Sequence, residues 1–309
     1  HHPFDGDGMI TSINFKNGKV TLTNRFVRTK AWEEEEKEGK FLYRGVFGTK
    51  KSGPEILNFL DVRLKNIANT HVIKLGDELL ALWEAAEPYS LDPETLETNG
   101  ISNLRGVLEP KEAFSAHPRF DPGHHQEPRM VSFGVKTGPT STIRLMEFST
   151  QGENSGQLIS DRRDKFQGFA FLHDFAITAN WAIFLQNPID FNPLPFLLGQ
   201  KGAAQCLKSN PNRQAKFILI PRDSGLFSKQ SPRIFDAPKG FVFHHLNAFE
   251  NDDKVIIDSI FYNDFPSIGP NEDFRTIDFS TLPEGILKRC KINLLTKELS
   301  LETLSNQCC

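Results

Sequence analysis

Three histidines in this chain lie in or beside strand-like segments and could together bind one metal ion. They are His117 in FSAHPRFDP, His173 in FAFLHDFAIT and His244 in FVFHHLNAFE. Neutral imidazole is a common ligand of zinc, copper, iron and nickel. Because the spacings of 56 and 71 residues are too long for a metal motif on one helix, distant strands would have to meet at one point. We predict a metal centre in an apolar cavity; the alternative for each histidine alone is a hydrogen-bonded core or turn residue.

If these histidines bind one metal, their ring nitrogens must converge to within about 3–4 Å, as ligands about 2.0–2.2 Å from one ion do. The other histidines fit an ordinary structural role. His124 and His125 lie in the polar loop PGHHQEP, and His71 is expected at the end of a strand. We do not expect His124, His125 or His245 to join the cluster.

Short strand-like segments separated by turns run along the whole chain and must position the histidines. Segments such as KFILIP, RMVSFGVKT and KVIIDSIFY are rich in β-branched and aromatic residues, and turn residues such as Asn17-Gly18 separate them. A strand about every ten residues favours an all-β sandwich, barrel or propeller. No crisp repeat selects among these. Because no linker is visible, we predict one domain over residues 1–309.

Helices are predicted to be few and short in this chain. Residues 55–65 and 195–207 could each form a turn or more of helix. The acidic run Glu33–Glu36 is predicted to be a solvated loop.

Composition restricts the class of protein. The chain has 309 residues, of which 38% are hydrophobic and 24% charged, as expected of a soluble globular protein with a large core. A net charge of -3 gives no electrostatic reason to expect a nucleic-acid partner. The four cysteines include no CxxC pair, which favours a reducing compartment over a disulfide framework. No signal peptide, transit peptide or membrane-spanning stretch is visible.

Several common functional motifs are missing from the sequence. There is no GxGxxG after a strand, no GxxxxGK[ST], no HExxH and no GxSxG. The segment beginning at Asp5, DGDG, resembles the start of a calcium loop. Its twelfth position is Lys16 rather than glutamate, so we reject an EF-hand and expect a polar turn.

Taken together, ten segments in this order resemble the carotenoid cleavage oxygenases, in particular those of the cyanobacterial type. Any one of them is modest evidence, whereas ten in the same order are specific. The segments are HHPFDGDGMI, NRFVRT, GVFGTKKSG, DVRLKNIANT, LLALWEAAEPYSLDPETLET, FSAHPRFDP, FLHDFAIT, FLQNPIDFNPLPFLLG, FILIPR and FHHLNAFE.

The resemblance implies a seven-bladed β-propeller with a non-haem Fe(II) on its axis, held by four histidines. His117, His173 and His244 match the first three ligands. The family's third ligand precedes a motif asparagine by three residues, and here that asparagine is Asn247, which selects His244 over His245. His245 would then point the other way on the strand.

No histidine follows His245, so the position of the fourth ligand is not represented in this chain. By resemblance we expect about four or five of the seven blades, with the domain incomplete at both ends. An open ring would expose strand edges and apolar faces. We therefore expect the isolated chain to be poorly soluble, to bind iron more weakly than four histidines would, and to have little or no activity.

The resemblance also suggests roles for residues beside the histidines. Glu84 matches a carboxylate that accepts a hydrogen bond from a ligand imidazole and so fixes its orientation. Trp83, Phe171 and Phe243 match the aromatic lining of a substrate tunnel. The alternatives are an exposed charge at a strand end for Glu84 and core packing for the aromatic residues.

The activity implied is Fe(II)-dependent cleavage of a C=C bond in a carotenoid or apocarotenoid by O2, which yields two carbonyl products. One alternative is an inactive, truncated carotenoid-binding or regulatory fragment, which the missing fourth histidine favours. A retinoid isomerohydrolase-like activity is disfavoured by the cyanobacterial-type segments ALWEAAEPYSLDPETLET and NPIDFNPLPFLLG.

A carotenoid dissolves in membranes, so the tunnel mouth should touch one. The apolar residues of NPIDFNPLPFLLG are the predicted membrane patch, with an inter-blade loop packed on the core as the alternative. We expect a plastid or cytoplasmic protein in peripheral contact with a membrane. The patch residues are Leu194, Phe196, Leu197 and Leu198.

Overall fold

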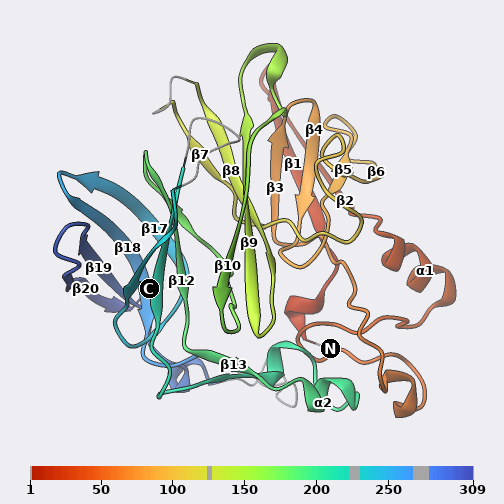
Figure 1. Ribbon diagram of the computed structural model, residues 1–309. Helices are drawn as coiled ribbons and strands as arrows, with labels where there is room; N and C mark the ends of the chain where they lie inside the picture. The colour runs from red at the N-terminus through yellow and green to blue at the C-terminus, as the bar shows by residue number, and fades with distance from the viewer. Residues whose placement is uncertain (1, 124–126, 223–229, 267–277, 309) are drawn as a thin grey trace.

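The structure is a computed structural model that describes residues 2–123, 127–222, 230–266 and 278–308. Most of these residues belong to antiparallel β-sheets, and helices are few and short (Figure 1). His124 and His125 lie outside the described residues. No helix among the described residues is both long enough and apolar enough to cross a lipid bilayer.

Four four-stranded antiparallel sheets form most of the molecule, and they succeed one another along the chain (Figure 1). The first contains β3 (His71–Leu75), β4 (Glu78–Leu82), β5 (Tyr89–Leu91) and β6 (Thr98–Ile101). The second contains β7 (Arg119–Asp121), β8 (Arg129–Lys136), β9 (Thr140–Ser149) and β10 (Leu158–Gln167). The third contains β11 (Ala176–Ile177), β12 (Trp181–Gln186), β15 (Lys216–Pro221) and β16 (Arg233–Asp236). The fourth contains β17 (Phe241–Asn251), β18 (Lys254–Tyr262), β19 (Ile286–Asn293) and β20 (Leu299–Cys308).

Two hairpins and several short helices complete the described part of the chain. The hairpins are β1 (Met9–Lys16) with β2 (Lys19–Phe26), and β13 (Ile189–Phe191) with β14 (Leu207–Ser209). The α-helices are α1 (Lys30–Glu38) and α2 (Pro193–Leu197). Short 3-10 helices cover Pro3–Asp5, Glu55–Asn58, Gly152–Asn154, Ala204–Cys206 and Phe279–Thr281.

The core lies between neighbouring sheets, because side chains alternate between the two faces of each strand. In β12, Ile183 and Leu185 pack toward the fourth sheet, whereas Ala182 and Phe184 pack toward the second. In the same way Met130 of β8 packs toward the first sheet. Both faces of the two middle sheets are therefore buried, which explains why their strands read as nearly continuous apolar runs.

The all-β prediction is confirmed, and the sheets are antiparallel with mainly consecutive strands. Stacked four-stranded sheets are the arrangement that a propeller requires, but the described strands do not close into a ring. The propeller, its number of blades and the single domain over 1–309 remain predictions.

The prediction of a loop at Glu33–Glu36 is wrong, because this run lies within α1. Thr29 caps the helix by accepting a hydrogen bond from the backbone N–H of Trp32 at 3.1 Å, and Gly39 ends it with a φ of 62°. Glutamate and lysine favour helix, and a glycine with positive φ is a common helix end. Glu35 is buried and paired with Lys65 at 2.6 Å, so the acidic run is only partly solvated. Of the two predicted helices, residues 55–65 form a 3-10 turn only at Glu55–Asn58, and 195–207 overlaps α2 and the turn Ala204–Cys206.

Candidate metal centre

The three histidines predicted to bind a metal come from the starts of three consecutive sheets. His117 precedes β7 by two residues, His173 precedes β11 by three, and His244 lies in β17. Strand β11 contacts both β7 and β17, so the first strands of the second, third and fourth sheets lie side by side. This packing brings together histidines that are far apart in the sequence.

One ring nitrogen from each of the three histidines lies within 4.8 Å of the others. The Nε2 atoms of His117 and His173 are 3.0 Å apart. The ring centre of His244 lies 5.3 Å from that of His117 and 4.9 Å from that of His173. The set is slightly wider than the predicted 3–4 Å, so the nitrogens would have to move slightly closer together for one ion to contact all three at ordinary ligand distances.

The protonation of the three rings is set by burial and by one carboxylate. Burial, helped by the neighbouring His173, lowers the pKa of His117 to about 4. Burial and His173 likewise lower the pKa of His244. Burial also acts to lower the pKa of His173, but the hydrogen bond and charge of Glu84 outweigh it, so this pKa is raised. His117 and His244 are therefore neutral at pH 7 and keep a lone pair for a ligand bond.

Glu84 lies two residues beyond β4 and contacts His173 from the side opposite the cluster. Its Oε2 is 2.5 Å from Nδ1 of His173. Because Nδ1 carries the proton that Glu84 accepts, Nε2 is the unprotonated nitrogen in the neutral form of His173, and it faces His117. The side chain of Glu84 is 31% exposed, so it is not the fully exposed strand-end charge of the alternative interpretation.

Aromatic rings flank one side of the cluster. The ring centres of Phe243 and His173 are 5.6 Å apart in an edge-to-face arrangement, and those of Phe171 and Phe243 are 6.3 Å apart. Phe241 and Phe265 extend the same group, and no motif in the sequence marks these two residues. Trp83 is 6% exposed and adjoins Glu84 in the chain.

His245 does not join the cluster, as predicted. It is buried, and its Nδ1 lies 2.7 Å from the hydroxyl of Ser259 in β18. Burial lowers its pKa to about 4, so it is a neutral core histidine. His71 is also outside the cluster: its Nδ1 lies 2.9 Å from the carbonyl oxygen of Ala116, which precedes His117.

The donor set suits a divalent transition metal. Two imidazoles are neutral by burial, and the third is oriented by a carboxylate that itself stays out of the cluster, an arrangement frequent around metal-binding histidines. Among the described residues, no cysteine or carboxylate joins the three histidines. Imidazole ligands alone are compatible with iron, zinc, copper or nickel, so the donors do not choose the metal.

The predicted membrane patch is only partly at the surface. Leu194 is 59% exposed and Leu198 is 40% exposed, and Leu197 is half-buried. Phe196 is buried at 8%, so the prediction that it faces outward is wrong. The physical reason is the guanidinium of Arg44, which lies 4.1 Å from the centre of the Phe196 ring and covers it.

Comparison with known proteins finds relatives that match this chain over its whole length. Residues 1–309 match the family described as Retinal pigment epithelial membrane protein. The chain is 43% identical over 312 residues to apocarotenoid-15,15'-oxygenase of Synechocystis, covering 100% of this chain and 62% of the relative. It is 32% identical over 274 residues to carotenoid 9,10(9',10')-cleavage dioxygenase 1 of Arabidopsis thaliana, covering 83% of this chain and 48% of the relative. The chain thus spans roughly half to three-fifths of the length of these relatives.

The same likeness extends to three dimensions. The crystal structure of cobalt-substituted Synechocystis apocarotenoid oxygenase superimposes with a TM-score of 0.93 at 42% identity, covering 100% of this chain and 63% of that one. The cobalt substitution in that structure indicates a metal site in the Synechocystis protein.

Proposed function

Because the chain belongs to the Retinal pigment epithelial membrane protein family of carotenoid oxygenases, we propose that it takes part in the oxidative cleavage of a carotenoid or apocarotenoid C=C bond by O2. The observation that carries the proposal is the convergence of His117, His173 and His244 beside Glu84. The comparisons do not favour the alternative of an inactive binding fragment.

In this proposal the three histidines hold Fe(II), which when bound supplies the open positions at which O2 is activated. The reaction adds both oxygen atoms across one C=C bond and breaks it, leaving one carbonyl group on each product. Glu84 holds His173 in the required tautomer. The rings of Phe171 and Phe243 present an apolar surface beside the cluster, which excludes water and orients a polyene that has few polar handles.

The function can be tested with a protein that contains this chain, loaded with Fe(II) and mixed with an apocarotenal in air. Cleavage shortens the conjugated system, so visible absorbance should fall and two carbonyl products should form. Bleaching that is equal without oxygen, or equal after His117→Ala, would contradict the proposal.

Replacement of Glu84 by glutamine is expected to weaken metal binding about 10–100-fold, the usual cost of losing a carboxylate that orients a ligand imidazole. The amide keeps the shape of Glu84 but can place its NH2 against Nδ1 of His173 and so reverse the tautomer. Titration with Co²⁺ followed by visible absorption measures the change. Glu78→Gln is a control on the preceding strand, since Glu78 contacts Ser102 rather than a histidine. Equal cobalt affinity in Glu84→Gln and the native chain would rule out this role.

We also propose that the surface around α2 contacts a membrane and that it is larger than the sequence indicated. The neighbouring segment after Pro54 runs beside α2, because the backbone N–H of Leu60 donates to the carbonyl of Leu197 at 2.8 Å. Its side chains add to the exposed leucines of α2. The exposed apolar residues of this membrane surface are Ile56, Leu57, Phe59, Leu60, Val62, Leu194 and Leu198.

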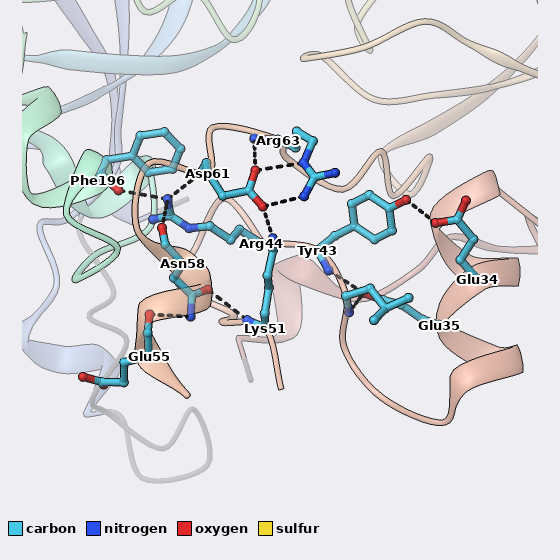
Figure 2. Close-up of polar contacts among 11 residues, drawn as sticks. Glu34, Glu35, Tyr43, Arg44, Lys51, Glu55, Asn58, Asp61, Arg63 and Phe196 are labelled. Atoms are coloured by element: carbon cyan, nitrogen blue, oxygen red, sulfur yellow. Dashed lines mark hydrogen bonds and ion pairs between the residues drawn. The ribbon is translucent and has the colours of Figure 1, made fainter. Parts of the chain in front are cut away.

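Arg44 holds the two segments of the membrane surface together (Figure 2). Its guanidinium donates to the carbonyl of Phe196 at 2.9 Å, of Asp61 at 2.7 Å and of Lys201 at 2.7 Å. Arg44 is 2% exposed, and burial lowers its pKa. Since its donors satisfy carbonyls on both segments, apolar side chains can face outward without leaving buried backbone groups unpaired.

Substitution of Leu60 or Leu194 by aspartate is expected to weaken binding to phosphatidylcholine vesicles by about tenfold or more, because burying a leucine contributes about 1.5–3 kcal/mol. Sedimentation with vesicles measures the bound fraction. Leu295→Asp is the control, because Leu295 is 70% exposed in the β19–β20 turn, away from this surface. If Leu295→Asp reduces vesicle binding as much as Leu60→Asp does, the membrane surface is assigned to the wrong place.

A further inference from the structure

The residues that follow the three histidines form a network of their own on the buried side of the cluster. Arg119 follows His117 by two positions, Asp174 follows His173 by one, and the backbone of His245 follows His244 by one. The network therefore touches each segment that carries a proposed ligand.

Arg119 and Asp174 form its centre. Nη2 of Arg119 lies 2.6 Å from Oδ2 of Asp174 and donates to the carbonyl oxygen of His245 at 2.8 Å. Its Nε donates to the carbonyl oxygen of Phe175 at 2.9 Å. Oδ2 of Asp174 also accepts the backbone N–H of His245 at 2.9 Å. One ion pair thus bridges β7, the chain entering β11, and β17.

Strand β17 needs such a support at this point. Its pairing with β18 shifts register between Val242 and His245 and again between His245 and Asn247. A bulged strand bends and re-aims its side chains, so the ladder with β18 alone does not fix the direction of His244. Arg119 and Asp174 bind the C=O and the N–H of the next residue and hold the bulge in place.

The free energy needed to bury the Asp174 carboxylate also suggests that the ion pair does more than stabilise the core. The side chain of Asp174 is 1% exposed, and its Oδ1 has no hydrogen-bond partner among the described residues. Burying a charge costs free energy that an ion pair rarely repays in full, and an apolar residue would often stabilise a core as well. An ion pair offers what an apolar residue does not, namely directional bonds to defined backbone atoms.

We propose that Arg119 and Asp174 are positioning residues that set the geometry of the three-histidine cluster, an inference that rests on the proposed metal-dependent function. Without the pair, His117 and His244 are free to move relative to His173. The bound metal would then meet a distorted and less well organised set of nitrogens.

The test is titration of Arg119→Met and Asp174→Asn with Co²⁺, which reports affinity and, through its visible bands, ligand geometry. Both variants are expected to raise the Co²⁺ dissociation constant about 10–100-fold, as lost outer partners of metal ligands do, and to alter the bands. Arg119→Lys keeps the charge but not the fork of donors, and it should recover part of the affinity. The matched control is Arg289→Met, since the Arg289 side chain is also 30% exposed and donates to Asp258 from Nε at 2.7 Å and from Nη2 at 2.8 Å.

Thermal unfolding followed by circular dichroism separates folding from geometry, and the isosteric Asp174→Asn serves if Arg119→Met does not fold. Loss of stability with unchanged cobalt affinity and bands in both Arg119→Met and Asp174→Asn would overturn the inference. An equal effect of Arg289→Met on cobalt binding would do the same. If the native chain binds no Co²⁺, the proposed metal centre itself is wrong and this inference falls with it, whereas failure of this inference alone leaves native binding intact.

Discussion

Replacement of His173 by alanine is expected to abolish metal binding at the three-histidine cluster. Its Nε2 lies 3.0 Å from that of His117, its ring lies 4.9 Å from that of His244, and it alone of the three is bound by Glu84. Removing His173 leaves only two imidazoles, those of His117 and His244, to bind a metal ion. We therefore expect no Co²⁺ or Fe²⁺ to bind at the cluster, a larger effect than the loss of about 10–100-fold in affinity on losing an outer partner, and we expect bleaching of an apocarotenal to stop.

The matched control for this prediction is His71→Ala. His71 lies on the first strand of its sheet and contacts the carbonyl of Ala116 next to His117, yet it is outside the cluster. It should bind metal as the native chain does. Metal titration and metal content after gel filtration measure both variants. Native-like metal content in His173→Ala would remove the basis of the proposed function.

The site could be predicted in part because ligand histidines on apolar strands stand out from their surroundings. The sequence marks His117, His173 and His244 by chemistry, and the resemblance supplies Glu84. Arg119 and Asp174 carry no such mark, because arginine and aspartate beside strands are usually exposed. Only the packing of β7, β11 and β17 shows that the side chain of Arg119 bridges two segments that are distant in sequence. Their adjacency to the histidines was the one signal available.

The fold was predictable at the level of class and less so in detail. Alternation and turn residues predict many antiparallel strands, and the structure contains them. Helix α1 was missed because a run of glutamates reads as solvated until its cap, Thr29, and its end, Gly39, are considered together. Phe196 was expected at the surface because it lies in a short apolar segment rich in leucine. The arginine that packs on its ring is far away in the sequence, so no local pattern reveals the contact.

The largest effect on stability is expected from Arg222→Met. The Arg222 side chain is fully buried, and it lies 2.7 Å from Asp121 and 3.0 Å from Glu147. It also donates to the carbonyl of Thr178 at 2.6 Å, so it joins the second sheet to the third. Removing it deprives two buried carboxylates of this guanidinium, while Glu147 keeps its second arginine, Arg129, at 3.3 Å. Breaking a buried ion pair costs about 3–5 kcal/mol of unfolding free energy.

Urea unfolding measures this loss, and Lys291→Met provides the comparison. Lys291 and Glu302 pair at 2.7 Å with side chains 39% and 53% exposed, so that variant should cost about 0–1 kcal/mol. A second test combines Arg222→Met with Glu147→Leu. Because the loss in Arg222→Met arises largely from buried carboxylates that lose the Arg222 charge, removing one carboxylate should recover part of it. The double variant should therefore lose less stability than the sum of the two single variants. Additive losses would mean that Arg222 stabilises the sheets by packing rather than by compensating buried charge.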